Sequence, residues 1–97
     1  MNNRNKETNP DHDLYRAVLL LKNREECYQF FHDLCTMGEL KAMEQRCEVA
    51  QLLHEGKIYN DILEQTGAST ATISRVKRSL DYGMDSYRKL FQRMEEE

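Results

Sequence analysis

The sequence has little of what a many-stranded or membrane-spanning protein needs. With one proline and four glycines in 97 residues, few chain reversals are available, so a sandwich or barrel of short strands is not expected. The longest wholly apolar run, residues 17–21, is far shorter than the roughly 20 residues that cross a bilayer. Three cysteines, an odd number, and a polar start without the apolar stretch of a secretory signal predict reduced thiols in the cytoplasm.

The sequence also lacks the residue groups that most enzymes and metal sites require. No Cys-X-X-Cys pair and no glycine-rich phosphate loop occurs, and no Ser/His/Asp arrangement can be placed. His32 and Cys35 are three residues apart, with Cys27 on the same stripe, but a structural zinc takes four such ligands, usually in tight pairs. We therefore expect neither enzymatic activity nor a bound metal or other cofactor.

Apolar side chains do recur at helical spacing, in six segments and without a convincing strand. Asn9, followed by Pro10, is expected to cap the first helix, and Asn23, with Glu26 three residues later, is expected to cap the second. The positions expected on their buried stripes are Leu14, Val18 and Leu21, followed by Cys27, Phe30, Phe31 and Leu34.

The rest of the chain predicts four more helices, the second of them over residues 59–66. Small polar side chains stand where caps are needed, and glycines stand where helices must stop. The expected caps are Thr36 with Glu39, Ser69 and Asp85, and the expected stops are Gly56, Gly67 and Gly83. The side chains expected inside are Leu40, Met43, Cys47, Ala50, Leu53, Ile62, Leu63, Ile73, Val76, Leu80, Tyr87, Leu90, Phe91 and Met94.

Residues 58–80 have the sequence form of a helix-turn-helix. Gly67 allows the sharp reversal, and apolar side chains on both sides of it are expected to clamp the two helices together. The second helix opens with small or hydroxylated residues, which are slim enough to approach base edges in a major groove about 12 Å wide. The residues expected to face bases are Ser69, Thr70, Ala71 and Ser74.

Basic residues gather in the same part of the chain. Residues 69–93 carry six basic and two acidic side chains, a local charge of +4, although the whole chain sums to −3. This excess fits docking onto DNA phosphates, whereas a solvated helix face is the alternative. The expected phosphate contacts are Arg75, Lys77 and Arg78. Asn60 and Tyr59, at the start of the preceding helix, would reach phosphate or a base, or have only a local capping or surface role.

Residues 36–80 resemble the Trp repressor family, and residues 67–80 most resemble its YerC/YecD-type branch. The segment Ala-Thr-Ile-Ser-Arg, residues 71–75, is the specific part of this resemblance. The resemblance implies an all-α, six-helix fold with a helix-turn-helix, in an intertwined homodimer whose first three helices build a shared core. It also implies two recognition helices, about 34 Å apart, in successive major grooves of a near-palindromic operator. The extensive apolar stripes of the first two helices independently favour a partner subunit.

The resemblance further implies a partly retained corepressor pocket. Arg46 and Arg75 match the two arginines that sandwich the indole of tryptophan, and Thr36 and Ser79 match two further pocket positions. Simpler roles are open to most of them, because Thr36 is also a helix cap and each arginine has glutamates nearby, such as Glu64 for Arg75.

The chain departs from the tryptophan-binding members at three places. Val76 stands where those members have a glycine that touches the indole, and its branched side chain would fill the space of the ring. Asp33 falls on a leucine position, and the link between Gly56 and Gly67 is one residue shorter. We therefore expect a different small ligand, or none, in place of tryptophan.

Together these observations predict a cytoplasmic, homodimeric, sequence-specific DNA-binding transcription regulator that represses by occupying its operator. Two alternatives stay open: a helical module that binds a protein partner through the same two helices without autonomous DNA binding, and a ligand sensor without tight DNA binding. The predicted single domain covers residues 9–94, with dimerisation helices over 9–56, a helix-turn-helix over 58–82 and a C-terminal helix over 84–94, between a disordered segment, 1–8, and an acidic tail, 95–97.

Overall fold

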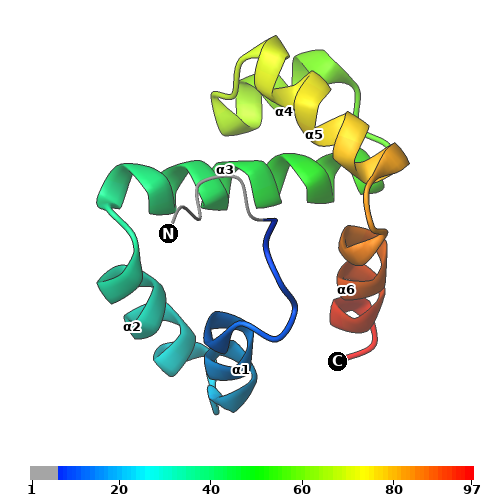
Figure 1. Ribbon diagram of the computed structural model, residues 1–97. Coiled ribbons are helices and arrows are strands. Elements are labelled where there is room, and N and C mark those ends of the chain that lie inside the picture. Colours follow the sequence, from blue (N-terminus) through cyan, green and yellow to red (C-terminus); the bar gives the residue numbers. More distant parts are fainter. Residues whose placement is uncertain (1–6) are drawn as a thin grey trace. The chain divides into compact units, whose positions relative to one another are not determined.

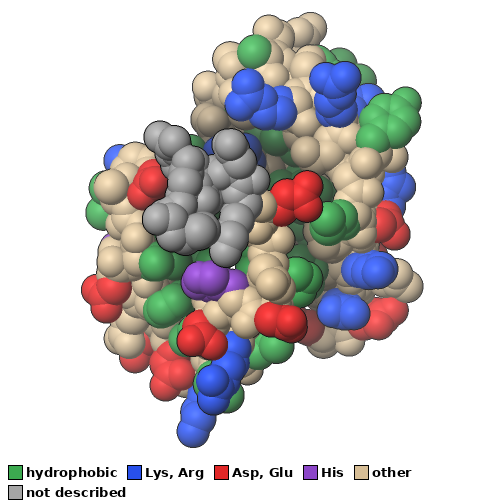
Figure 2. Space-filling model, in the orientation of Figure 1, with side chains coloured by type: hydrophobic (Ala, Val, Ile, Leu, Met, Phe, Trp, Pro, Cys, Tyr) green, Lys and Arg blue, Asp and Glu red, His purple; other side chains and the backbone are tan. Residues whose placement is uncertain are grey.

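The computed structural model describes residues 7–97, which form six helices and no strand (Figure 1). The helices are α1 (Asp13–Leu20), α2 (Arg24–Leu34), α3 (Met37–His54), α4 (Tyr59–Thr66), α5 (Thr70–Tyr82) and α6 (Ser86–Glu95). In this part of the chain no helix is both long and apolar enough to cross a bilayer. Charged side chains are spread over the face drawn in Figure 2. The predicted all-α, six-helix fold is confirmed for these residues.

The chain divides after Thr36 into two compact units, one with α1 and α2 and one with α3 to α6. The boundary falls inside the segment 9–56 that the sequence assigns to dimerisation, and that assignment stays a prediction. Of residues 1–8, for which disorder is predicted, the first six lie outside the described residues, and the last two are exposed and precede the first turn.

α1 begins at Asp13, later than the sequence predicts. The side chain of Asn9 accepts a hydrogen bond from the N–H of Asp11 at 2.8 Å, and its carbonyl oxygen accepts from the N–H of His12 at 3.0 Å. These bonds close a separate turn, so Asn9 does not cap the helix. His12 takes the capping position instead, and its Nδ1 accepts from the N–H of Leu14 at 3.0 Å.

α2 begins where predicted, but the first unit has no core of its own. The side chain of Asn23 accepts from the N–H of Glu26 at 2.8 Å, and the carboxylate of Glu26 accepts from the N–H of Lys22 at 3.0 Å. No residue of α1 or α2 is buried, and Leu34, which was expected inside, is 53% exposed. Two helices of 8 and 11 residues offer too little surface to enclose their apolar stripes.

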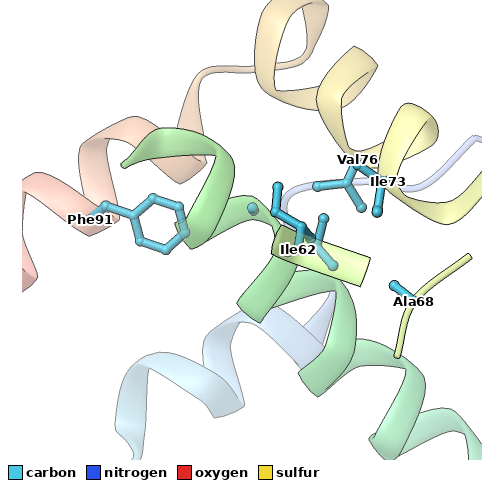
Figure 3. Packing of buried hydrophobic residues seen from close by; sticks show 7 residues of the cluster. Ile62, Ala68, Ile73, Val76 and Phe91 are labelled. Carbon is cyan, nitrogen blue, oxygen red and sulfur yellow. The ribbon is translucent and has the colours of Figure 1, made fainter. Parts of the chain in front are cut away.

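The core of the second unit brings together side chains from α3, α4, α5 and α6. In Figure 3, Ile62 of α4 lies next to Ile73 and Val76 of α5, and Ala68 lies in the turn between the two helices. Packing against α3 therefore holds α4 and α5 in place, in addition to the short turn that joins them. We call the following residues the buried cluster: Val49, Ala50, Ile62, Ala68, Ile73, Val76 and Phe91.

α3 and α6 turn partly different side chains inward from those predicted. On α3, Cys47 is exposed, whereas Val49, which was not expected inside, is fully buried. On α6, Leu90 and Met94 are about half exposed, at 50% and 51%, and Phe91 is the buried side chain. α3 contacts three other helices, so a single stripe at regular spacing does not describe its buried surface.

The link between α5 and α6 contains Gly83 and Asp85, as predicted, but Asp85 acts differently. The N–H of Gly83 donates to the carbonyl oxygen of Ser79 at 2.8 Å, and a Cβ at position 83 would collide with that oxygen. Asp85 precedes α6 but makes no capping hydrogen bond, because its backbone is left-handed, with φ 65°, and not extended as in a usual cap. Its carboxylate instead lies 3.7 Å from Nε of Arg88.

Replacement of Ile73 by alanine is expected to lower the free energy of unfolding by about 2–5 kcal/mol, because the fully buried side chain would leave a cavity in the buried cluster. The matched control is Ile58→Ala, since Ile58 is 63% exposed and the expected change is within about 0.5 kcal/mol. Urea titration followed by circular dichroism measures both values. Equal losses would contradict the place of Ile73 in the core.

Candidate nucleic-acid interface

α4 and α5 are joined by a turn of three residues, 67–69. Gly67 takes a left-handed conformation with φ 70°, and its N–H donates to the carbonyl oxygen of Leu63 at 2.9 Å. The space around Gly67 would admit a Cβ, but the positive φ would strain any residue that carries one. The backbone of the turn, and not its packing, therefore requires glycine.

The hydroxyl of Thr66 fastens the same turn. It donates to the carbonyl oxygen of Ile62 at 2.7 Å and accepts from the N–H of Ala68 at 3.1 Å. The carbonyl oxygen of Thr66 in turn accepts from the side-chain amide of Gln45 on α3 at 3.2 Å. The turn is thus tied both to α4 and to α3. Neither Thr66 nor Gln45 was predicted from the sequence. The contact of Gln45 joins residues 21 positions apart, for which local spacing carries no signal, whereas the bonds of Thr66 to Ile62 and Ala68 are local and were missed.

Ser69 is the N-cap of α5, as predicted. Its hydroxyl oxygen accepts from the N–H of Thr72 at 3.1 Å, and the same hydroxyl donates to the side-chain oxygen of Thr72 at 3.1 Å. Among the residues expected to face bases, Ser69 therefore uses its hydroxyl inside the protein. Thr70, Ala71 and Ser74 are exposed, and two of them carry hydroxyls.

The exposed face of α5 lies on the side opposite its contact with the buried cluster. At about 100° per residue, Thr70, Ser74 and Arg78 fall within about 80° of one another around the helix axis. Ala71 lies beside them, and all four residues are exposed. We call these four residues the reading face. Its N-terminal part has small and hydroxylated side chains, and its C-terminal part has the cation Arg78. This order suits a helix that enters a major groove with its N-terminus first, since short side chains then reach the bases and the cation lies near the phosphates.

Arg75 and Lys77 lie at the two edges of the reading face, about 160° apart around the axis, and both are exposed. A helix in a groove has phosphates on both sides, so this placement suits contacts to two backbones. Figure 2 shows basic side chains over the region that α4 and α5 occupy in Figure 1. Within residues 7–97 neither Arg75 nor Arg78 forms an ion pair, and the pairing of Arg75 with Glu64 is not found.

Lys77, by contrast, is already paired. Its Nζ lies 3.0 Å from Oδ2 of Asp81, and Nη2 of Arg88 lies 3.6 Å from Oδ1 of the same carboxylate. The hydrogen bond from Lys77, together with Arg88, lowers the pKa of Asp81 below its ordinary value. The carboxylate is therefore ionised at neutral pH, and the pairs are lost only as the pH falls through this lowered pKa. Asp81 was not predicted as a site residue, although its i,i+4 spacing from Lys77 is the usual signal of such a pair.

The start of α4 offers one polar side chain to a partner. Asn60 is exposed, whereas Tyr59 is partly buried and packs against the buried cluster. Ile58 occupies the N-cap, where no side chain makes a capping hydrogen bond, so Asn60 has no capping role. Tyr59 contributes to packing, and Asn60 is the candidate for contact with DNA.

The residues implied for a corepressor pocket differ in exposure. Arg46 on α3 is exposed, as are Arg75 and Ser79 on α5. Val76 is only 2% exposed and belongs to the buried cluster. Thr36, the last residue of the first unit, is exposed. The Val76 side chain is thus part of the core of its own unit, in the space next to Ile62 and Ile73.

A hollow of about 610 Å³ lies along α3, but its walls do not include the predicted ligand residues. It is lined by charged and polar side chains of α3, by Cys47 and by Thr66 of α4. Within residues 7–97, no group of three or more His, Cys, Asp or Glu side chains is arranged to hold a metal ion. The polar and exposed part of α5 is therefore the candidate site that the structure supports best.

The sequence matches known proteins over most of its length. A sequence profile described as "Trp repressor protein" matches residues 12–95. The protein YerC from Bacillus subtilis strain 168 is 54% identical over 83 residues, which cover 86% of this chain and 80% of YerC. The predicted resemblance to the Trp repressor family and its YerC-type branch is confirmed.

Two crystal structures show the same fold. A TrpR-like protein from Eubacterium eligens superposes with a TM-score of 0.85 and 52% identity, covering 96% of this chain and 95% of the other. A candidate Trp repressor from Staphylococcus aureus superposes with a TM-score of 0.86 and 47% identity, covering 100% of this chain and 97% of the other. The six-helix, Trp-repressor-like fold predicted from the sequence is therefore confirmed.

Replacement of Thr66 by valine is expected to lower the free energy of unfolding by about 1–3 kcal/mol, because the buried N–H of Ala68 loses its acceptor. Thr70→Val makes the same chemical change at an exposed position and is expected to alter stability by no more than about 0.5 kcal/mol. Urea denaturation of both variants gives the comparison. If the loss at position 66 were as small as at position 70, the hydroxyl would not hold the turn.

Proposed function

The chain belongs to the Trp repressor family, in its YerC-type branch, and we propose that it is a DNA-binding transcription regulator that represses by occupying an operator. The observation that carries this proposal is the exposed reading face of α5, which lies opposite the buried cluster. The turn before α5 is fixed by the backbone of Gly67 and the hydroxyl of Thr66. The family is regulatory and not enzymatic, which agrees with the lack of a catalytic arrangement in the sequence. Because the proposed partner is chromosomal DNA, we also propose that the protein is located in the cytoplasm.

Sequence preference comes, in this proposal, from the front of α5. The hydroxyls of Thr70 and Ser74 donate to or accept from base edges, and Ala71 contacts a thymine methyl group. Ser69 sets the start of the helix through its cap, and the cap leaves one lone pair of its exposed hydroxyl for contact with DNA. These short side chains bring the helix axis close to the floor of the groove.

Affinity comes from cations that contact phosphates. Arg75 and Lys77 reach the two walls of the groove, Arg78 extends the reading face toward the backbone, and Asn60 adds a neutral contact from the start of α4. Because Arg75 and Arg78 form no ion pair within residues 7–97, they meet phosphate without first losing a protein partner. Each such contact releases counterions and makes binding depend on salt.

A homodimer completes the proposal. α1 and α2 bury no residue within the chain, and they expose large apolar side chains such as Leu19 (85%), Leu20 (66%) and Tyr28 (60%). A second copy of the chain would cover these surfaces, as the family resemblance implies. Two copies of α5 would then enter successive major grooves of a near-palindromic operator.

Tryptophan is not part of the proposed function. A corepressor that stacks between Arg46 and Arg75 needs open space at position 76, and the valine there adds a branched side chain to the region. Arg46, Arg75 and Ser79 are exposed and together would suit a small ligand other than an indole.

The test is a titration of duplex DNA, selected from a random pool, at several salt concentrations. Lys77→Ala is expected to weaken binding to all duplexes alike and to reduce the slope of log K against log salt by about one. Lys41→Ala removes an exposed lysine from α3 and is expected to leave the slope unchanged. A flat titration of the wild-type protein would favour the protein-interaction module instead. An unchanged slope for Lys77→Ala would remove Lys77 from the phosphate contacts.

Substitution of Ser74 by alanine is expected to change which sequences are bound and not the salt slope. One base position of the selected site should lose about 1–3 kcal/mol of discrimination, because a hydroxyl that contacts the base edge is removed. Ser86→Ala, at the start of α6, provides the matched control. Repeated selections from a random pool with all three proteins measure the preference, and an identical site for Ser74→Ala would exclude Ser74 from base contact.

A further inference from the structure

Two carboxylates lie inside the basic region, and one of them, Asp81, lies on α5, the helix that carries the charged phosphate contacts. Asp81 holds Nζ of Lys77 at 3.0 Å and Nη2 of Arg88 at 3.6 Å, so a single acid pairs with cations from α5 and α6. Asp85 lies 3.7 Å from Nε of Arg88 and gives this arginine a second carboxylate partner. Of the three cations on α5 that are assigned to phosphates, only Lys77 is paired within residues 7–97.

Asp81 points to the same side of α5 as the reading face. At about 100° per residue it lies about 20° from Thr70 and about 20° from Ser74 around the axis. It follows Thr70 by about 16 Å along the helix, at a rise of about 1.5 Å per residue. A helix that inserts its N-terminal end into the groove therefore brings this carboxylate toward the phosphates at the groove edge, where a negative charge is repelled.

From this placement we infer that Asp81 restrains DNA binding through partner exchange: Lys77 leaves Asp81 for a DNA phosphate, and Arg88 stays with Asp81 and compensates part of its charge. The inference rests on the proposed DNA-binding function and assigns a residue that limits its affinity. It requires that the pair with Lys77 open easily and that the pair with Arg88 persist.

The exposure of the Lys77 pair and the position of Arg88 support these two requirements. The side chains of Lys77 and Asp81 are 48% and 34% exposed, and ion pairs at such exposure contribute little, so phosphate can replace the carboxylate. The side chain of Arg88 is as exposed, at 47%, and its distance to Asp81 is longer, but it lies on α6, outside the reading face, and has Asp85 as a second carboxylate partner. No phosphate contact is assigned to Arg88, so it stays near Asp81 while Lys77 turns to DNA. The charge that remains beside the phosphates is smaller than that of a free carboxylate, which lets binding proceed at reduced affinity.

The restraint has a signature in the salt dependence. After Lys77 leaves, the carboxylate, only partly compensated by Arg88, lowers the net positive charge that the protein brings to the DNA, so fewer counterions are released. Removing the charge of Asp81 should therefore raise affinity and also make the salt dependence steeper. If the carboxylate only repelled DNA, without holding Lys77, its removal would raise affinity equally whether or not Lys77 were present.

The decisive experiment compares Asp81→Asn with the wild-type protein on one selected duplex, over a range of salt concentrations. Asp81→Asn is expected to bind about 3- to 10-fold more tightly near 0.1 M salt and to steepen the log–log slope by up to about one. In the Lys77→Ala background the same substitution should give less than half of that gain on a logarithmic scale, because the exchanged partner is gone. Asp85→Asn removes an equal charge that contacts Arg88 but not Lys77, and we expect at most a 2-fold change.

The outcomes separate this inference from the function on which it rests. If the wild-type protein shows no salt-dependent binding to duplex DNA, the proposed function fails, and the inference fails with it. If the wild-type protein binds and Asp81→Asn binds no more tightly, the restraint is absent. If Asp81→Asn gains as much in the Lys77→Ala background, Asp81 acts by repulsion alone and partner exchange is wrong. Thermal unfolding of each variant, followed by circular dichroism, ensures that folded proteins are compared.

Discussion

The contact of Ile62 on α4 with Ile73 and Val76 on α5 is the interaction on which the rest of the site depends. It commits one side of α5 to the core and leaves the opposite side in solvent. A helix discriminates between bases only if its angle to the scaffold is constant, because small displacements move short hydroxyls out of reach of base edges. The hydrogen bonds of Thr66 and the left-handed backbone of Gly67 fix the turn between α4 and α5, and so help to set the angle of α5. Stability and recognition therefore rest on the same few buried side chains.

Charge acts on this scaffold locally and not as a property of the whole molecule. The chain is acidic overall, at −3, while residues 69–93 carry an excess of positive charge. The rest of the chain is acidic on balance, so electrostatic attraction favours approach to DNA through residues 69–93. Asp81 changes this charge distribution, because it pairs with Lys77 in the free protein and leaves Arg75 and Arg78 as the cations on α5 without an ion pair to any described residue. Affinity is thus limited by the same helix that supplies it.

The sequence predicts most closely those features that are decided by neighbours in the chain. The bounds of α4 and the cap at Ser69 follow from spacing and capping chemistry within a few residues, and both are confirmed. At Asn9 two local bonding patterns compete, and the turn prevails over the cap. Tertiary contacts are harder to predict, because several helices share the surface of α3: Val49 was missed for this reason, and so was Gln45, whose partner lies on α4.

The difference between local and tertiary contacts also applies to the first unit, where the single chain forms the helices but buries none of their residues. Helices of 8 and 11 residues are marginal in water by themselves, and α1 and α2 bury no residue that would offset their loss of conformational entropy. Surface from outside this unit must therefore stabilise them. If the proposed second copy supplies it, folding of α1 and α2 and assembly of the dimer become one process. The spacing of the two α5 helices then depends on packed side chains and not on a flexible linker, which is the condition for reading two half-sites at a fixed distance.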